Sequence, residues 1–548
     1  MELTLKGIQD RSAWTDKGYN LPEFDIVEVQ ERTAKAPTWI HFGGGNLFKA
    51  FPSRFTQELL NKGVLDKGIV VAEGFDYEII EKMSRPHDNL SLVVTLKSDG
   101  SIDKDIVASV TESLVLDSSN KAEFDRLKEI FENPSLQMAS FTITEKGYSL
   151  TNAKGEILPA IQEDFEKGPE APVSYIGKVA ALLYDRYQHG ELPIAMVSMD
   201  NCSHNGDKLK SAVMAYAEVW TKNGLVDEGF EAYLNNPEKV SFPWTMIDKI
   251  TPRPDTEVEK MLAADHIDGL EPVITSKNTY VAPFTNAEET EYLVVENTFP
   301  NGRPALEEAG VIFTDRDTVN KVEKMKVTTC LNPLHTALAV YGCILGYDKI
   351  YEEMRDEDLT SLISGIGYDE GLPVVVNPGV LDPEEFINTV IDVRFPNPFM
   401  PDTPQRIATD TSQKLAVRFG ETIKSYLREG KDLNDLDLIP LVQAGWIRYL
   451  MALNDNGEAF TLSPDPLLEE VLPIANQLSL EEEQDVASII EPLLKNEKIF
   501  GLDLTETVLS DKVVAYVTAL TNGKGAIRKT LHEAVENHKQ KKAEKTAS

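Results

Sequence analysis

The sequence predicts an α/β chain of two domains: a Rossmann-type, doubly wound N-terminal domain over residues 1–300 and a mainly α-helical C-terminal domain over residues 301–548. Three observations predict this fold class. Residues 37–60 have the pattern of a strand, a glycine turn and a helix. Further strand-like runs alternate with helical patterns, which favours a parallel sheet. Beyond about residue 300, long helical patterns dominate.

Length and composition describe a globular protein and exclude several classes of partner. A chain of 548 residues exceeds one ordinary domain, and 42% hydrophobic with 26% charged residues is typical of globular proteins. The net charge of −36 argues against nucleic acid or an anionic membrane as partner. Three scattered cysteines predict neither a disulfide framework nor a zinc site. With no signal-peptide pattern and no long apolar run, we expect a cytoplasmic protein, monomeric or weakly oligomeric.

The glycine turn is the first candidate cofactor site. Residues 37–42 predict a strand, Gly43, Gly44 and Gly45 follow at once, and the spacing of apolar residues up to Leu60 predicts a helix. This order brings backbone N–H groups at a helix N-terminus to a pyrophosphate. The usual third glycine is missing, so a plain tight turn remains the alternative.

A second predicted strand, residues 68–76, carries two candidate ribose-binding carboxylates, Glu73 and Asp76. An acidic side chain at this position accepts hydrogen bonds from ribose hydroxyls and repels a 2′-phosphate, which favours NAD over NADP. The sequence leaves open which of the two carboxylates lies at the ribose.

Two polar segments follow further predicted strands. Strand patterns cover residues 90–96, 137–144 and 193–199, and polar residues 142–148 and 198–207 follow the last two. Ligands of open α/β sheets bind at the carboxyl ends of the strands, so both segments are candidate sites, with simple turn formation as the alternative. A later connection, residues 242–252, carries the carboxylate of Asp248.

The C-terminal domain begins with a candidate catalytic group. Asn332 and His335 are three residues apart at the start of a helix predicted over residues 332–346, so they share one face. An amide, an imidazole and the preceding Lys326 suit carbonyl chemistry. The plain alternatives are a helix cap, a core histidine and a surface charge. Further helices are predicted at residues 384–393, 411–429, 437–453, 482–495 and 523–539, and the charged tail 538–548 is expected to fray.

These residues resemble the polyol-specific long-chain dehydrogenases, which include mannitol 2-dehydrogenase and the reductases of fructuronate and tagaturonate. Residues 41–51 (HFGGGNLFKAF) resemble the FGxGNFxRAF form of the tagaturonate reductases. Residues 142–148 resemble the family's TxTExGY block, and residues 200–206 resemble DNxxxNG. Residues 242–252 are similar to FPxTMVDRITP, and residues 301–310 are similar to a GRPxxExAG segment. The resemblance extends from Trp39 to Leu427.

The resemblance implies a Rossmann-type domain and a helical domain with the site in the cleft between them, the cofactor NAD, and catalysis without a metal. It assigns the catalytic roles to Lys326, Asn332, His335 and Asn201, with Glu323 on the proton path. It assigns substrate binding to Arg406 and Lys414, and Asp248 in the similar segment 242–252 is a further substrate-binding candidate. The cofactor-binding residues expected from the turn and the neighbouring strand ends are Gly43, Gly44, Gly45, Asn46, Leu47, Glu73, Asp76 and Thr144.

One departure from the family concerns Lys326. The family has four residues between its lysine and its asparagine, whereas this chain has five, Val327 to Leu331. On a continuous helix the extra residue rotates the lysine by about 100° relative to Asn332. Because Val-Thr-Thr-Cys is a poor helix sequence, we expect Lys326 on extended chain, with a bulge or looped turn absorbing the residue.

The function predicted from the sequence is NAD-dependent hydride transfer between a linear keto-sugar acid, fructuronate or tagaturonate, and its aldonate. Leu47, Lys49 and Phe51 differ from the residues of mannitol-type members, which favours the sugar-acid reductases. The alternatives are a mannitol 2-dehydrogenase-type enzyme acting on a polyol and its ketose, and a non-catalytic relative that binds a nucleotide or a sugar.

Overall fold

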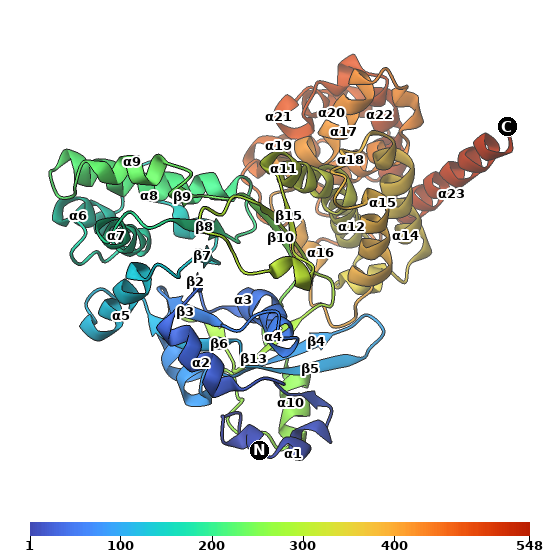
Figure 1. Cartoon of the computed structure of the whole chain (residues 1–548). Helices are drawn as coiled ribbons and strands as arrows, with labels where there is room; N and C mark the ends of the chain where they lie inside the picture. Colours follow the sequence, from blue (N-terminus) through green and yellow to red (C-terminus); the bar gives the residue numbers. More distant parts are fainter. The chain divides into compact units, whose positions relative to one another are not determined.

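The computed structural model describes residues 1–548 and divides the chain into two compact units. Unit 1 comprises residues 1–97 and 101–320, and unit 2 comprises residues 98–100 and 321–548 (Figure 1). The sequence pattern changes at about residue 300, but the division between the units lies after residue 320. The two positions differ because residues after 300 still contribute a strand to unit 1. That strand is β15 (Ile312–Thr314), which pairs in parallel with β14 (Tyr292–Glu296).

A six-stranded parallel sheet forms the centre of unit 1. Its order is β6-β3-β2-β7-β8-β9, and every neighbouring pair runs parallel. The chain starts in the middle, builds one half and then crosses to build the other, as in doubly wound dinucleotide-binding folds. The predicted doubly wound sheet is thus confirmed. Its strands are β2 (Trp39–Phe42), β3 (Ile69–Glu73), β6 (Val110–Val115), β7 (Met138–Phe141), β8 (Ile194–Ser198) and β9 (Val240–Ser241).

The helices of unit 1 connect these strands and cover the sheet. A π-helical turn, Lys49–Ser53, joins α3 to α4. The helices are α1 (Arg11–Thr15), α2 (Ile26–Lys35), α3 (Asn46–Phe48), α4 (Arg54–Asn61), α5 (Lys121–Glu132), α6 (Pro159–Lys167), α7 (Tyr175–Gln188), α8 (Asn205–Lys222), α9 (Gly229–Asn235) and α10 (Thr256–Ala264), and α11 (Arg316–Met325) runs across the division between the units.

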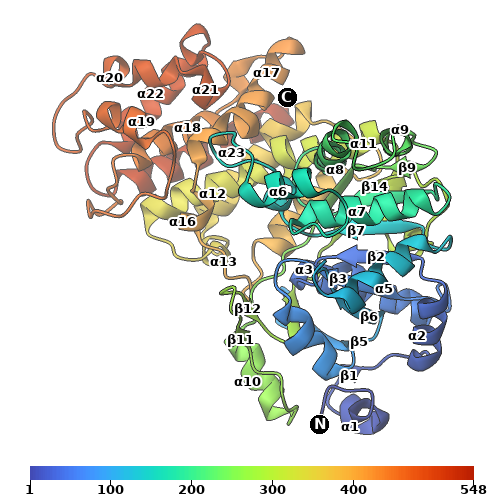
Figure 2. The same ribbon diagram turned by 90° about the vertical axis from the view of Figure 1, so that its left-hand side faces the viewer.

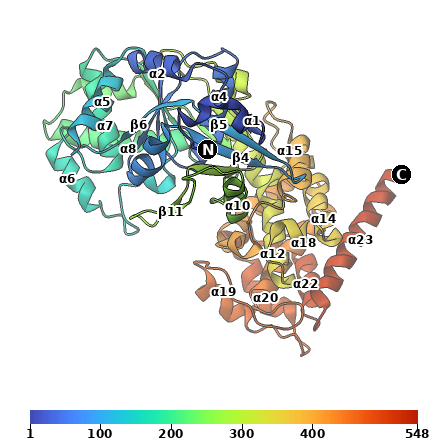
Figure 3. The ribbon, with the colours of Figure 1, turned by 90° about the horizontal axis from the view of Figure 1, so that it is seen from below.

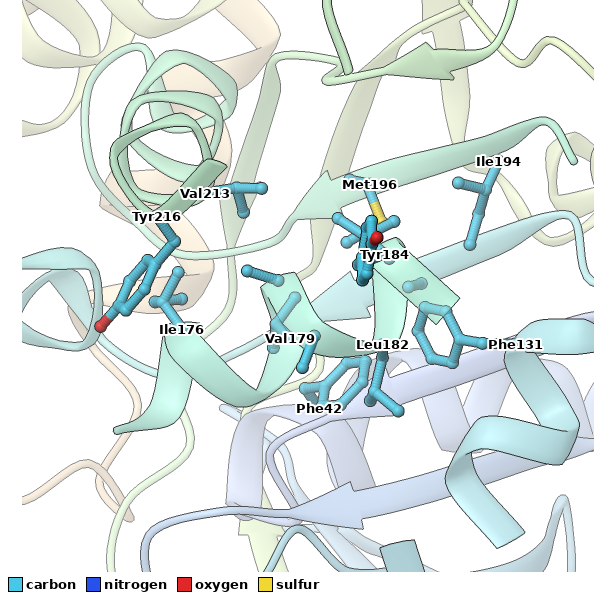
Figure 4. Close-up of a cluster of buried hydrophobic side chains, with 14 of the residues drawn as sticks. Phe42, Phe131, Ile176, Val179, Leu182, Tyr184, Ile194, Met196, Val213 and Tyr216 are labelled. Atoms are coloured by element: carbon cyan, nitrogen blue, oxygen red, sulfur yellow. The ribbon is translucent and has the colours of Figure 1, made fainter. Parts of the chain in front are cut away.

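Both faces of the parallel sheet are buried, which explains why its strands are apolar runs rather than alternating patterns. Phe42 lies in a core that includes α5, α7, α8 and α9, and Figure 2 looks onto the face that α5 and α7 cover. Figure 4 shows Phe42 beside Val179 and Leu182 of α7. On the other face, Trp39 lies in a second core with Phe55 of α4. The two cores hold β2 rigidly at the start of the glycine turn.

The predicted strand at residues 90–96 forms, but it does not join the parallel sheet. β4 (Ser91–Leu96) pairs antiparallel with β5 (Ile102–Val107) in a separate sheet of order β1-β5-β4-β13. The connection between them is too short for the crossover that a parallel neighbour requires, so they form a hairpin. The third strand along the chain in the doubly wound sheet is instead β6, whose sequence VTESLV mixes polar and apolar residues.

The remaining strands form small sheets beside the main one. β10 pairs antiparallel with β14, and β11 pairs antiparallel with β12. The two edge strands of the β4 sheet are β1 (Tyr19–Asn20) and β13 (Phe284–Ala287). The strands of the small sheets not yet given are β10 (Thr245–Asp248), β11 (Val273–Ile274) and β12 (Tyr280–Val281).

Unit 2 is helical, as the sequence predicts, and is built around α12 (Asn332–Leu345) and α18 (Leu438–Tyr449) (Figure 3). The Tyr341 hydroxyl donates to the Leu441 carbonyl oxygen at 2.6 Å. Gly445 leaves room for this ring, because a Cβ there would lie 2.7 Å from it. The other helices are α13 (Ile350–Glu353), α14 (Glu357–Ser364), α15 (Pro383–Thr389), α16 (Pro404–Ile407), α17 (Glu421–Arg428), α19 (Leu468–Ala475), α20 (Val486–Leu494), α21 (Glu497–Phe500), α22 (Leu509–Leu520) and α23 (Ala526–Ala547).

The predicted helices correspond to these elements with two corrections. Residues 411–429 do not form one helix but a 3-10 turn, a π turn (Ala416–Gly420) and α17. The tail does not fray, because α23 continues to Ala547. Its second half lacks large apolar residues but is held by ion pairs of Lys542 to Asp369, Lys541 to Asp437 and Lys545 to Asp435, and by a hydrogen bond between His538 and Asp369. No helix in the structure combines the length and apolar character needed to cross a membrane.

Candidate active site

The glycine turn follows β2 and can be built only with glycine at its first position. Gly43 has φ +112°, and a Cβ there would lie 2.2 Å from the Thr142 carbonyl oxygen. A Cβ at Gly45 would meet nothing within 4 Å, so the backbone there is open to a ligand. Gly45 precedes α3, whose first residues are Asn46 and Leu47. The N–H groups of Gly43 and Gly44 already donate, to the Ala72 carbonyl oxygen and to Glu73, so the backbone that suits a pyrophosphate is that of Gly45 and the start of α3.

Glu73, at the end of β3, lies against this turn. Its Oε1 accepts from the Gly44 backbone N–H at 2.9 Å, and its Oε2 accepts from the N–H groups of Phe75 and Asp76 at 2.8 and 3.0 Å. The carboxylate therefore joins the glycine turn to the loop after β3. Asp76 has a different environment: it is 1% exposed and accepts a hydrogen bond from the Thr275 hydroxyl at 2.6 Å.

His41, which no sequence pattern indicates as a site residue, lies in β2 directly before the glycine turn. His41 of β2 is buried between two hydroxyls, with Nδ1 2.6 Å from Ser140 Oγ and Nε2 2.7 Å from Thr142 Oγ1. Burial lowers the pKa of its imidazole to about 3, so the ring is neutral and serves one hydroxyl as donor and the other as acceptor. It stacks on Phe48, with the ring centroids 4.1 Å apart.

Asp200 joins the loops that follow β7 and β8. Its two carboxylate oxygens accept from the backbone N–H groups of Ile143 and Thr144 at 3.1 and 2.8 Å, and Oδ2 also accepts from the Tyr148 hydroxyl. Burial raises the pKa of this carboxyl group above its usual value. The next residue, Asn201, is exposed. The structure therefore places Thr144 and Asn201 on two adjacent, cross-linked loops at the carboxyl edge of the sheet.

Asn205 fixes the second loop to β10. Its side-chain amide donates to the Thr245 hydroxyl at 2.8 Å and to the Asp200 carbonyl oxygen at 3.0 Å, while its Oδ1 accepts from the Thr245 N–H. β10 ends at Asp248, which is 8% exposed. Asn205 is thus structural, and the Asn-Gly pair does not form the simple turn that was the alternative, because its two residues begin α8.

In unit 2, Lys326 is helical rather than extended. It begins a five-residue π helix, Lys326–Cys330, that joins α11 to α12. The expectation of extended chain is wrong, because a π turn takes up one more residue than an α turn within helical chain, and only Leu331, just before α12, leaves the helical conformation. Lys326 is buried, and Glu323 lies three residues earlier on the same helical face, partly exposed.

Asn332 and His335 occupy the first turn of α12, as predicted. The imidazole of His335 stacks on Phe395, with the ring centroids 5.1 Å apart, and its Nε2 is 3.9 Å from Asp402 Oδ2. Burial lowers the pKa of His335 to about 3. Asp402 acts to raise this pKa, and the nearby Arg418, Arg406 and Arg394 act to lower it. His335 is therefore a neutral imidazole, suited to exchanging hydrogen bonds with a hydroxyl.

The two predicted substrate-binding cations have different environments. Arg406 is exposed and forms a bidentate ion pair with Asp402, through Nε and Nη2 at 2.7 Å each. Lys414 is half-buried, and its Nζ donates to the Ile407 carbonyl oxygen at 2.9 Å. A third cation, which the sequence analysis does not identify, follows Lys414 by one helical turn: Arg418 donates to the Thr336 hydroxyl at 2.7 Å.

A group with the composition of a metal site lies elsewhere in unit 1. Ligand atoms of Glu132, Asp185 and His189 lie within 4.8 Å of one another. Burial and the facing Glu132 raise the pKa of Asp185 to about 7. These residues end α5 and α7, just before β7 and β8, and so lie at the opposite edge of the sheet from the glycine turn.

Comparisons with known proteins match both halves of the chain. The model of the mannitol dehydrogenase Rossmann domain matches residues 37–308, and that of the mannitol dehydrogenase C-terminal domain matches residues 318–521. The D-mannonate oxidoreductase of Thermotoga maritima is 50% identical over 538 residues, 98% of this chain and 99% of that protein. The D-mannonate oxidoreductase of Escherichia coli is 29% identical and covers 88% of this chain and 92% of its own length.

Solved structures show the same fold. The ternary complex of Pseudomonas fluorescens mannitol 2-dehydrogenase with NAD and D-mannitol matches with a TM-score of 0.67 at 25% identity, over 98% of this chain and 100% of that chain. A substrate-free D-sorbitol dehydrogenase matches with a TM-score of 0.77 at 24% identity, over 94% and 97%. With its Rossmann domain, its helical domain and a close relative over nearly its whole length, this chain belongs to the mannitol dehydrogenase family.

Proposed function

We propose that this chain is an NAD-dependent oxidoreductase that interconverts a linear keto-sugar acid, fructuronate or tagaturonate, and its aldonate. The observation that carries the proposal is the group of cations at the start of α12, where Arg394, Arg406 and Arg418 lie near His335 with one carboxylate, Asp402. Lys414 lies beside Arg418, with Asp410 and Asp465 nearby, so four cations face three carboxylates. Such an excess of positive charge suits an anionic substrate end. The relative at 50% identity, named for D-mannonate, supports a sugar acid and, of the two, fructuronate.

In the proposed reaction, a bound nicotinamide supplies the hydride that reaches the carbonyl carbon. Lys326 gives its Nζ proton to the carbonyl oxygen, which becomes the hydroxyl of the aldonate. Asn332 and Asn201 are the proposed donors to that oxygen as negative charge develops on it, and preorganised donors of this kind contribute about 3 kcal/mol each. Glu323, on the same helical face as Lys326, is the proposed route for the proton from solvent.

His335 is proposed to position the substrate rather than to exchange protons. A neutral imidazole with a pKa near 3 keeps its protonation state throughout the neutral pH range. It can therefore donate to, or accept from, a hydroxyl next to the reacting carbonyl. Asp248 at the end of β10 is the proposed partner of another substrate hydroxyl.

The coenzyme choice is proposed to rest on Glu73. Three backbone N–H groups fix its carboxylate beside the glycine turn, so a ribose placed there meets a negative charge that disfavours a 2′-phosphate. Asp76, buried against Thr275, is the weaker candidate for this role. The residues present fit a dinucleotide, since nothing lies within 4 Å of the position of a Cβ at Gly45, which leaves the backbone at the start of α3 accessible.

The deciding experiment is NADH oxidation by the purified protein with fructuronate, tagaturonate and fructose, with NADPH in place of NADH as the control. Turnover of a keto-sugar acid with NADH is the expected result. Turnover of fructose alone would make the chain a mannitol 2-dehydrogenase-type enzyme. Binding of NADH without turnover of any of the three would favour the non-catalytic relative and overturn the proposal.

A further inference from the structure

Arg418 lies beside the proposed substrate site and forms no ion pair. It belongs to the π turn Ala416–Gly420, which packs against α12 and against the π helix that begins at Lys326. Its Nη1 donates to Thr336 Oγ1 at 2.7 Å, and Thr336, which is 1% exposed, follows His335 directly in α12. One N–H of the guanidinium is thus used to fix its position, and the others remain for a ligand.

Arg406, the cation that the family resemblance assigns to the substrate, is in the opposite situation. Its side chain is 73% exposed, and both oxygens of Asp402 already bind it. An exposed, hydrated and neutralised guanidinium gains little from a further carboxylate, because water and Asp402 both compete with the ligand. Asp402 in turn lies near His335, so the pair is placed to orient the imidazole.

The surroundings of Arg418 are electropositive and poorly solvated. Burial lowers the pKa of Arg418 to about 10. Burial, and then Arg418 as the strongest neighbouring charge, lowers the pKa of Lys414 to about 8, although Asp410 and Asp465 act in the opposite direction. Two desolvated cations one helical turn apart repel each other. An anion that binds both Lys414 and Arg418 therefore relieves this electrostatic repulsion.

We propose that Arg418, together with Lys414, binds the carboxylate of the substrate, and that Arg406 acts only as a positioning residue through Asp402. The inference rests on the proposed function and names the residue that distinguishes a sugar acid from a neutral sugar. The guanidinium presents donors in a plane that matches a carboxylate, and its hydrogen bond to Thr336 holds that plane next to His335.

The test compares Arg418→Gln with Arg406→Gln, and uses Arg428→Gln as the control that removes a similar charge from an exposed position of α17. For each variant, kcat and KM are measured with the keto-sugar acid, and the Kd of NADH and Tm are measured separately. We expect Arg418→Gln to raise KM for the acid at least about tenfold, the loss of a charged hydrogen bond, with kcat changed much less. Arg406→Gln should have the smaller effect on KM, and Arg428→Gln none.

Arg418→Lys distinguishes loss of binding from a folding defect, because it keeps the positive charge but lacks the planar guanidinium. It should recover part of the KM increase while NADH binding stays at the wild-type value. A larger KM effect from Arg406→Gln than from Arg418→Gln would overturn the inference, and so would wild-type KM in Arg418→Gln. An inactive wild-type protein with both keto-sugar acids would instead overturn the proposed function itself, so the two failures are distinguishable.

Discussion

Leu331 donates its backbone N–H to the carbonyl oxygen of Lys326, five residues earlier, at 3.1 Å. This is the hydrogen bond of a π turn, and it closes the segment in which the family resemblance implies one additional residue. The next bond, from the His335 N–H to the Leu331 carbonyl oxygen at 3.0 Å, is that of an ordinary α-helix. The extra residue is therefore taken up within a single turn.

Deletion of Thr328 tests whether the π turn absorbs the inserted residue. The side chain of Thr328 bonds only to the Lys324 carbonyl oxygen of its own helix, so its loss should convert the π turn to an α turn without moving Lys326 away from α12. We expect kcat within about tenfold of the wild-type value. Insertion of an alanine after Thr328 is the matched contrast and should lower kcat by about a hundredfold or more. Equal losses from deletion and insertion would contradict this account.

Lys326→Ala should lower kcat for the keto-sugar acid by at least about tenfold, because the proton donor is lost. NADH affinity and Tm should stay close to the wild-type values, since the proposed role is in the chemical step. Lys324→Ala, two residues earlier and exposed, is the control and should be fully active. Steady-state NADH oxidation measures both variants, and near-normal turnover of Lys326→Ala would remove the lysine from the mechanism.

Gly43→Ala and Gly45→Ala should separate folding from cofactor binding. At Gly43 the positive φ and the contact with the Thr142 carbonyl oxygen leave no room for a Cβ, so Tm should fall together with NADH affinity. At Gly45 nothing within 4 Å opposes a Cβ, so Tm should be unchanged. A lower NADH affinity in Gly45→Ala alone would place the pyrophosphate on that backbone; unchanged affinity would place it elsewhere. Thermal unfolding and NADH fluorescence titration measure the two effects.

Lys414 should make binding of the sugar acid depend on pH. Burial and the neighbouring Arg418 lower the pKa of Lys414 to about 8, so its positive charge is present below that pH and is lost as pH rises through it. We expect the Kd of the aldonate, measured by calorimetry with the enzyme–NADH complex, to increase above about pH 8. Lys414→Met should bind the aldonate weakly at every pH and without this increase. A Kd of the wild type that stays constant from pH 7 to about pH 9 would contradict the prediction.

The fold could be predicted from the sequence because its signals are local. The strand, glycine turn and helix of residues 37–60 depend on nearest neighbours, and apolar periodicity finds α12 directly. The sequence does not predict β6, because its polar residues hide a strand that is stabilised by pairing with β3. It predicts β4 but not its sheet, because strand propensity does not determine which partner a strand pairs with.

The site residues could be predicted from the sequence only where they form part of a recognisable motif. Lys326, Asn332 and His335 are close in sequence, but the direction of Lys326 depends on a π turn that propensities do not predict. The sequence does not predict Arg418 and His41 as site residues, because their hydrogen-bond partners are distant in sequence. These partners are Thr336 for Arg418, and Ser140 and Thr142 for His41. The different positions of Glu73 and Asp76 likewise depend on tertiary contacts.

The C-terminal helix has a practical consequence for handling the protein. The first half of α23 is anchored by buried Ile527, Leu531 and Val535, whereas the second half is held mainly by charge pairs. At 1 M salt the screening length falls to about 3 Å, comparable to the nitrogen–oxygen distances of these pairs, so their attraction weakens while apolar burial does not. The lysine-rich end will therefore become a substrate for trypsin in concentrated salt, and a purification tag placed there is best removed in dilute buffer, where the helix protects its own lysines.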